Sequence, residues 1–204
     1  IGGHRYFRSA DIDNFLRDIV AQAKQWASGT SPIEPPGDVY CQTADIFQAR
    51  LSRFERSLGA IPDLKNTFTL ISSVTGEVGN NSFDHNIGNW PDIPGIFFGY
   101  DLARRYLVLA DRGQGVLKTL KRVQPALMND TEAITVAFTK IISARAPQAR
   151  GNGLKYVRRV VVEQQLGLIF ISGNAQLTMS GKGDGLRFNA SDRYYQGCLV
   201  QITF

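Results

Sequence analysis

The sequence has few cysteines and no long hydrophobic segment. Its 204 residues include only two cysteines, Cys41 and Cys198, which lie far apart and match no metal-binding or redox spacing. Apolar runs such as "LIFIS" have the length of a strand and do not approach the roughly 18 residues of a membrane-spanning helix. We therefore expect a cytoplasmic protein with reduced thiols and no membrane partner.

Two further absences exclude classes of protein. The chain contains no G-x-x-x-x-G-K-[ST] segment, which excludes a P-loop nucleotide site. It contains neither internal repeats nor a low-complexity tract. Hydrophobic residues make up 43% of the chain and charged residues 20%, a composition that suits a globular domain with a sizeable core and argues against disorder.

Positive charge is concentrated in the middle of the chain. The formal net charge is +5, and residues 101–160 contain twelve Lys and Arg against four Asp and Glu. A basic surface attracts phosphate, whether on a nucleotide or on nucleic acid. No recognised nucleic-acid reader motif is present, so nucleic acid is not indicated as a partner. A solvated helix face is the simple alternative.

Hydrophobic periodicity predicts a series of helices and a strand-rich end. Helical spacing indicates helices within the first thirty residues and over 46–58, 64–87, 115–124, 130–143 and 154–165. Strands are expected at "FFGY", "YLVLAD", "GLIFISG", "AQLTMS", "LRFNA" and "GCLVQITF". This order predicts an α+β fold, a two-layer α/β sandwich with a mixed, mostly antiparallel sheet and helices on one face. Residues 1–60 would form an N-terminal helical extension, which packs onto the domain of residues 61–204 or forms a homodimer.

The stretch "TGEVGNNSFDHNIG" places polar residues within a helix that otherwise has a core pattern. Glu77, Asn81, Asp84 and His85 fall on one stripe of this helix. Glutamate and asparagine one turn apart supply a base and an oxygen ligand for a hard cation such as Mg²⁺. The stripe predicts the edge of a pocket, and a solvent-facing helix side is the alternative.

Two glycine-bearing segments lead into helices. In "YLVLADRGQGVLKTL", Asp111 ends a strand and can accept from an amino group, while Gly113 and Gly115 let a flat ring approach the backbone. In "RGNGLKYVRRVV", Gly151 and Gly153 lie at a helix start, where free N–H groups favour phosphate. Each segment could also be an ordinary turn. The cluster "GKGDG" has no following helix and is interpreted as a hairpin loop.

In this order, the motifs resemble those of the GHKL superfamily of gyrase-type ATPases, Hsp90 chaperones, histidine kinases and mismatch-repair ATPases. The resemblance covers roughly residues 64–204, and "EVGNNSFDH" is most similar to the corresponding segment of the anti-sigma-factor serine kinases. It implies a histidine kinase-like ATPase domain with a Bergerat-type fold, which binds ATP or ADP together with Mg²⁺.

The resemblance assigns a role to each motif residue. Glu77 would be the general base, Asn81 would hold Mg²⁺, and Asp111 would accept a hydrogen bond from the adenine amino group. The other expected nucleotide-binding positions are Gly113, Gly115, Arg150, Gly151, Asn152, Gly153, Leu154 and Cys198.

Two positions depart from the usual pattern of that superfamily. Cys198 follows Gly197 where most members have threonine, and Asp84 stands where histidine kinases often have Lys or Arg. The segment of about residues 116–150 would be the mobile lid over the nucleotide.

The resemblance leaves the use of ATP open. ATP binding, with hydrolysis or phosphotransfer, would regulate a protein partner. The alternatives are a non-catalytic module that senses nucleotide, and a protein kinase of the anti-sigma or histidine kinase type that phosphorylates a separate protein. Autophosphorylation is not expected, because the only histidine besides His85 is His4, which lies in "GGHRY" without a dimerising helix.

Overall fold

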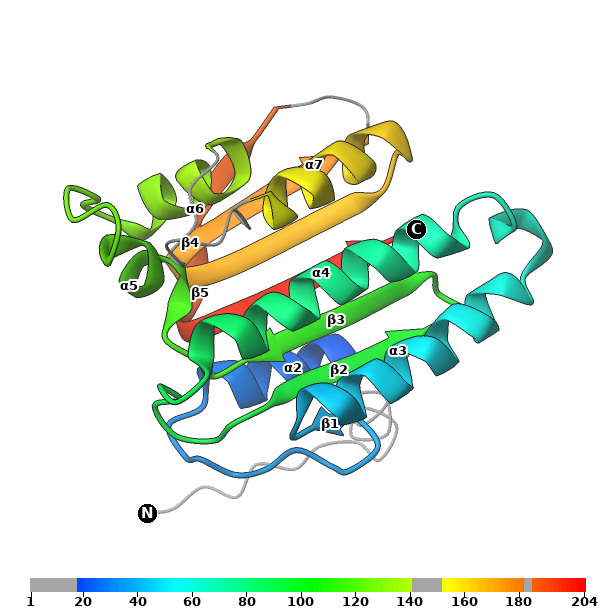
Figure 1. The fold of residues 1–204 in the computed structure, drawn as a ribbon, viewed down its shortest axis with the longest axis horizontal. Coiled ribbons are helices and arrows are strands. Elements are labelled where there is room, and N and C mark those ends of the chain that lie inside the picture. The colour runs from blue at the N-terminus through cyan, green and yellow to red at the C-terminus, as the bar shows by residue number, and fades with distance from the viewer. Residues whose placement is uncertain (1–17, 141–151, 182–184) are drawn as a thin grey trace, which may run out of the picture.

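The fold is built on a five-stranded sheet, seen in a computed structural model that describes residues 18–140, 152–181 and 185–204 (Figure 1). Its order is β1-β2-β3-β5-β4, and every strand pair in the described ranges is antiparallel. The strands are β1 (Tyr40–Cys41), β2 (Ile96–Asp101), β3 (Tyr106–Asp111), β4 (Gly167–Ser180) and β5 (Arg187–Thr203). Together with the helices, this sheet confirms the predicted α+β class.

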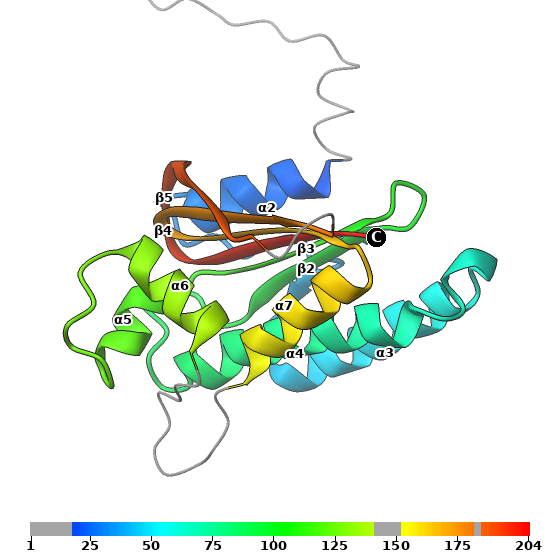
Figure 2. The same cartoon turned by 90° about the horizontal axis from the view of Figure 1, so that it is seen from above.

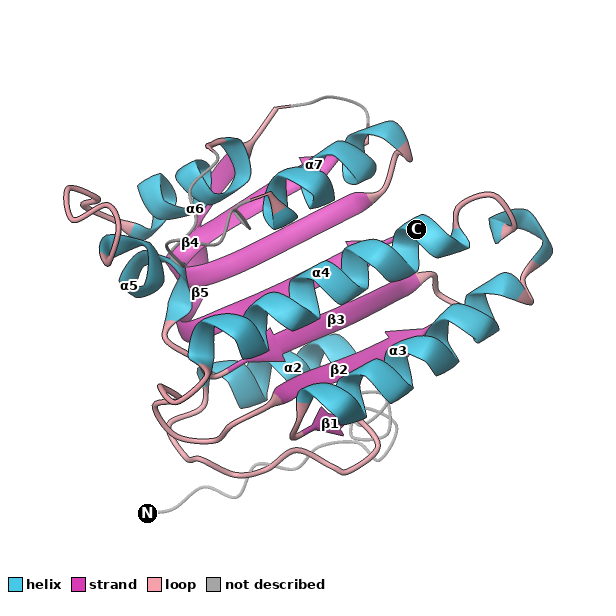
Figure 3. Ribbon diagram, viewed as in Figure 1, coloured by secondary structure: helices cyan, strands magenta, loops and turns pink. Residues whose placement is uncertain are grey.

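Helices cover the two faces of the sheet unequally. Three long helices lie on one face (Figures 2 and 3): α3 (Ala44–Gly59), α4 (Phe68–Asn86) and α7 (Gly153–Glu163). Beyond the end of β3 lie α5 (Gly115–Lys121) and α6 (Asp130–Thr139). The predicted helical layer is therefore present, and α2 (Ile19–Ser28) adds a smaller layer on the opposite face.

Residues 40–59 contribute to the main hydrophobic core. The apolar stripe of α3 is buried, and consists of Phe47, Leu51, Phe54 and Leu58. These side chains share one cluster with residues of α4, α7 and the sheet. Part of the stretch predicted as an N-terminal extension thus supplies a strand and a helix to this core. A short 3₁₀ helix, η1 (Pro62–Leu64), leads from α3 to α4. Residues 1–17, where the first predicted helix begins, lie outside the described residues.

The buried side chain of Arg112, which follows β3, connects helix α2 to the sheet through hydrogen bonds. Its Nη1 donates to the carbonyl oxygens of Trp26 and Gly29 at 2.6 and 2.7 Å, and its Nη2 donates to Asp92 Oδ2 at 2.6 Å. A cation at a helix C-terminus also interacts favourably with the helix dipole. Burial acts to raise the pKa of Asp92, but the hydrogen bonds from Arg112 and from the Ile93 N–H, together with the charge of Arg112, outweigh it, and the pKa lies below its ordinary value.

The last two strands form a long ribbon that bends. The β4–β5 register shifts around Gly173, which has a φ of +61°. Beyond this bend, the end of β4 comes back close to its beginning. A Cβ built on Gly181, which follows β4, would lie 2.0 Å from the Cα of Gln165, two residues before β4. The sequence predicted four separate strands here. Two continuous ones form instead, because a glycine in the left-handed region lets the pairing resume after the irregularity.

The approach of α3 to α4 depends on a glycine of α4. A Cβ built on Gly79 would lie 2.1 Å from a ring atom of Phe47, and that ring also packs edge-on against Phe98 at 5.5 Å. The ring therefore has little room to move away. Any side chain at position 79 would push the two helices apart.

We predict that Gly79→Ala destabilises the fold. Overpacking costs about 1–3 kcal/mol or more, whereas the better helix propensity of alanine returns at most about 1 kcal/mol. Urea unfolding should therefore show a lower midpoint. Gly37→Ala is the matched control, since nothing lies within 4 Å of a Cβ built there. Equal midpoints for the two variants would contradict the close helix contact.

Candidate functional site

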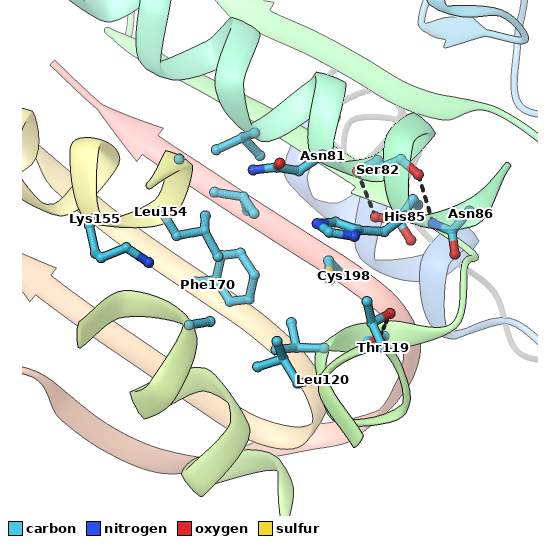
Figure 4. Close-up of a pocket in the computed structure, with 17 residues that line it drawn as sticks. Asn81, Ser82, His85, Asn86, Thr119, Leu120, Leu154, Lys155, Phe170 and Cys198 are labelled. Carbon is cyan, nitrogen blue, oxygen red and sulfur yellow. Dashed lines mark hydrogen bonds between the residues drawn. The ribbon is translucent and has the colours of Figure 1, made fainter. Parts of the chain in front are cut away.

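A cavity of about 110 Å³ opens beside the end of β3, bounded by α4, α5, α6, α7 and the sheet (Figure 4). Its walls are largely apolar, and are formed by Val78, Val116, Leu120, Ala137, Leu154, Phe170 and Val200. A few polar groups interrupt these walls. This combination is the usual form of a small-molecule site, and the volume is well above the roughly 10–15 Å³ that one water needs.

The buried carboxylate of Asp111 lines this cavity and is held by three donors. Its Oδ2 accepts from the Ser82 hydroxyl at 2.7 Å, and its Oδ1 accepts from the Gly113 N–H at 2.8 Å. The backbone N–H of Cys198 is the third donor. An ionised carboxylate offers about four acceptor positions. Donors from the described residues therefore fill three of about four acceptor positions.

Burial determines the acidity of two groups in the cavity. It raises the pKa of Asp111 above its ordinary value, and the hydrogen bonds from Ser82, Gly113 and Cys198 counteract the shift without cancelling it. Burial, followed by the charge of Asp111, also raises the pKa of the Cys198 thiol. The Cys198 side chain is therefore a neutral thiol at the cavity wall.

Close packing around Asp111 leaves no room for side chains at two glycines. A Cβ on Gly197 would lie 2.3 Å from both the carbonyl oxygen and Oδ1 of Asp111. A Cβ on Gly113 would lie 2.1 Å from Asn86 Nδ2. Asn86 itself is buried, and its Oδ1 accepts from the Gln114 N–H at 2.9 Å. The turn after β3 is thereby held against the C-terminal end of α4.

Helix α4 presents a different stripe to the cavity from the predicted one. Asn81 and His85 line the cavity as expected, together with Ser82 and Asn86. Neither Glu77 nor Asp84 is among the residues that line it, which corrects the predicted stripe at both positions. Successive residues of a helix are rotated by about 100° around its axis. When residues 81, 82 and 85 face the cavity, residue 84 therefore points to the side of the helix.

Glu77 lies on the same flank of α4, beside the first turn of α7. A Cβ on Gly153 would lie 1.9 Å from Glu77 Oε1, so the Glu77 side chain lies directly against Gly153 and requires glycine there. Among the described residues, no hydrogen bond holds the Asn81 side-chain amide. Asn81 can therefore offer its oxygen to a ligand without breaking a hydrogen bond to the described residues.

The first turn of α7 supplies positive potential to the cavity. Gly153, Leu154 and Lys155 line it, and the first N–H groups of a helix favour anions. Burial lowers the pKa of Lys155, whose Nζ donates to the Lys140 carbonyl oxygen at 2.5 Å. Asn152 precedes this turn and is exposed. The predicted positions Arg150 and Gly151 lie outside the described residues.

Most of the described motif residues meet at this one cavity. Asn81, Asp111, Gly115, Gly153, Leu154 and Cys198 line it, and Gly113 binds Asp111 directly. The sequence interpretation missed Ser82, Asn86 and Ser172. The first two lie four apart on α4 and would have been found by rotating the predicted stripe by one residue. Ser172 joins α5 to β5 by accepting from Val116 N–H at 3.1 Å and donating to the Gly197 carbonyl oxygen at 2.9 Å, and no sequence pattern indicates it.

Comparison with protein-family models and with curated proteins found no match to this chain. Across the described ranges, none of the helices has both the length and the apolarity to cross a bilayer. The chemistry of the cavity therefore carries the functional argument.

We predict that Asp111→Asn changes how stability depends on pH. The folded-state pKa of Asp111 is raised above about 3.9, the value of an unperturbed aspartate, so the folded protein binds this proton more tightly. The resulting stabilisation is present at low pH and is lost as pH rises from about 4 through the folded-state pKa. Urea unfolding at stepped pH should show the free energy of unfolding of the parent, minus that of Asp111→Asn, falling across this window.

Asp92→Asn provides a control of opposite sign. The pKa of Asp92 is lowered in the folded state, so its contribution is present above about pH 4 and is lost as pH falls. The parent-minus-variant difference should therefore rise with pH for Asp92→Asn. A difference that also rises for Asp111→Asn would contradict the raised pKa of Asp111.

Proposed function

We propose that this chain is a Mg²⁺-dependent ATP-binding domain of the GHKL type, which regulates a protein partner through ATP binding and hydrolysis or phosphotransfer. The observation that carries the proposal is the Asp111 carboxylate, buried in a largely apolar cavity, where the described residues fill three of its roughly four acceptor positions. The same cavity is bordered by the positive first turn of α7.

The Asp111 end of the cavity suits an aromatic base that carries an amino group. Apolar side chains such as Val116, Leu120 and Phe170 can contact the faces of a flat ring. The amino group of adenine would donate to the remaining acceptor position of Asp111. A hydrogen bond to a charged group contributes about 1.5–3 kcal/mol, enough to orient the ring.

The α7 end suits phosphate. The N–H groups at Gly153 and Leu154, the helix dipole and the Lys155 ammonium all favour negative charge. Asn81 would contribute its amide oxygen to Mg²⁺, which usually takes one or two protein ligands beside nucleotide phosphates and neutralises part of their charge. Such a site needs no cluster of acidic residues, and none of three or more His, Cys, Asp or Glu occurs in the described ranges.

Glu77 is the residue we assign as general base. Its carboxylate lies against Gly153, at the end of the cavity assigned to phosphate. It can accept a proton from water, or from the hydroxyl of a protein partner, as that oxygen attacks phosphorus. Hydrolysis and phosphotransfer would thus use the same base and differ in the attacking oxygen. A cytoplasmic location is part of this proposal, because Cys41 and Cys198 are free thiols and ATP is available there.

ATP with Mg²⁺ should raise the melting temperature of the protein, and ADP should do so less. A ligand at 100 times its dissociation constant stabilises the folded state by about 2.7 kcal/mol. Asp111→Asn should weaken binding by about 1–3 kcal/mol, because the amide replaces an acceptor by a donor. Asp92→Asn, on the opposite face, is the control that should keep parental affinity. Absence of any shift at millimolar nucleotide and low salt would exclude ATP binding by this chain.

Glu77→Gln and Asn81→Ala should fail in different ways. Loss of a general base lowers turnover by about 10²–10⁴-fold, so Glu77→Gln should retain ATP affinity and lose turnover. Asn81→Ala should lose the Mg²⁺-dependent part of ATP affinity, because the metal links this side chain to phosphate. Calorimetry with and without Mg²⁺ measures affinity, and γ-labelled ATP measures release or transfer of phosphate.

The same label distinguishes the possible uses of ATP. Label released as phosphate indicates an ATPase, and label on an added partner protein indicates a kinase. Parental affinity in both variants, with no turnover in the parent even with partners, would indicate a nucleotide sensor instead.

A further inference from the structure

Ser82 is the one side chain among the described residues that donates a hydrogen bond to the Asp111 carboxylate. Its hydroxyl reaches Oδ2 at 2.7 Å, and the other two donors are the backbone N–H groups of Gly113 and Cys198. The donor at position 82 can therefore be removed by substitution while the backbone donors are kept.

The Ser82 hydroxyl is held in place by its surroundings. Asn86, one turn later on α4, donates from Nδ2 to the Ser82 carbonyl oxygen at 2.8 Å. The Asn86 Oδ1 accepts from the turn that follows Asp111. The hydroxyl and the carboxylate are thus parts of one bonded frame, and the single hydroxyl hydrogen of Ser82 is committed to Asp111.

We propose that Ser82 is a specificity-determining residue, which holds Asp111 as a hydrogen-bond acceptor so that the cavity selects purine rings carrying an amino group over rings carrying a carbonyl group at that position. This inference rests on the proposed function and adds to it the residue that sets the choice of base.

The selection follows from the two forms of a carboxyl group. An ionised carboxylate only accepts hydrogen bonds, whereas a protonated carboxyl also donates one. The first form attracts an amino group and repels a carbonyl oxygen, and the second form can bind a carbonyl oxygen. Burial already raises the pKa of Asp111, and the Ser82 hydrogen bond is one of the forces that oppose this rise. Without that hydroxyl, the proton would remain on Asp111 at higher pH.

Other charged groups around Asp111 need to be kept constant in any test. His85 on α4, Lys155 on α7 and Cys198 on β5 line the same cavity. Arg112 is adjacent in the chain and is bound to Asp92 and α2. A substitution at Ser82 changes the chemical identity of none of them. A difference in pH profile between the parent and that variant therefore reports on Asp111.

The test compares ATP with inosine triphosphate, which has the same phosphates and a carbonyl in place of the adenine amino group. Dissociation constants with Mg²⁺ are measured calorimetrically for the parent and Ser82→Ala between about pH 5 and about pH 8. The parent should prefer ATP. Ser82→Ala should bind ATP about tenfold or more weakly, with the loss growing as pH falls, and should bind inosine triphosphate no more weakly than the parent does.

Ser73→Ala is the matched control, because Ser73 lies on the same helix and its hydroxyl accepts from Tyr156 at 2.9 Å outside the cavity. It should keep the parental ratio of the two affinities at every pH. If Ser82→Ala does not fold, Ser82→Cys replaces it, since a thiol of similar size is a weak donor. A parental ratio and pH profile in a folded Ser82 variant would overturn this inference while leaving ATP binding intact. A parent that binds neither nucleotide would overturn both.

Discussion

The buried carboxylate of Asp111 is the constraint on which the arrangement of the site depends. A carboxylate removed from water is tolerated only when donors replace its hydration. Here the donors come from α4, from the turn after β3 and from β5, so that one charge joins three elements that are distant in the sequence. The close approach of β5 in turn requires glycine at position 197, where a Cβ would lie 2.3 Å from Asp111 Oδ1. The cavity exists beside this charge because the three elements converge on it from different directions.

The end of β3 also joins the two faces of the sheet. Successive residues of an extended chain point to opposite sides, and Asp111 and Arg112 follow this alternation with opposite charges. The first faces the cavity and the long helices, and the second reaches α2 and Asp92. Neither charge neutralises the other directly, since each has its own buried partners. Two adjacent residues therefore connect the cavity on one face of the sheet with α2 on the other.

Much of the fold and part of the site could be predicted from the sequence, for different physical reasons. Apolar residues at helical spacing, such as those of α3, report directly on a local conformation and a buried face, so the helices and the α+β class were accessible. Which face of α4 points to the cavity was harder to predict, because several stripes of this helix have helical spacing. The predicted stripe included Glu77 and Asp84, which do not line the cavity, and omitted Ser82, which does. The bend at Gly173 and the bond network of Ser172 depend on contacts between distant segments. No local pattern reports such contacts.

Cys198 is one of the residues that donate hydrogen bonds to the Asp111 carboxylate. The neutral thiol of Cys198 is a weak donor, and it is the backbone of this residue that binds the carboxylate. The proposed relationship to GHKL proteins would place a threonine hydroxyl here, and this chain lacks that donor. The hydroxyl of Ser82 lies 2.7 Å from the same carboxylate and comes from the opposite wall of the cavity. The Asp111 carboxylate is therefore bound by a hydroxyl from α4 and by a backbone N–H from β5, and on β5 the cavity is lined by the Cys198 thiol and the apolar side chain of Val200. Cys198 and Ser82 thus lie in one site around the same carboxylate.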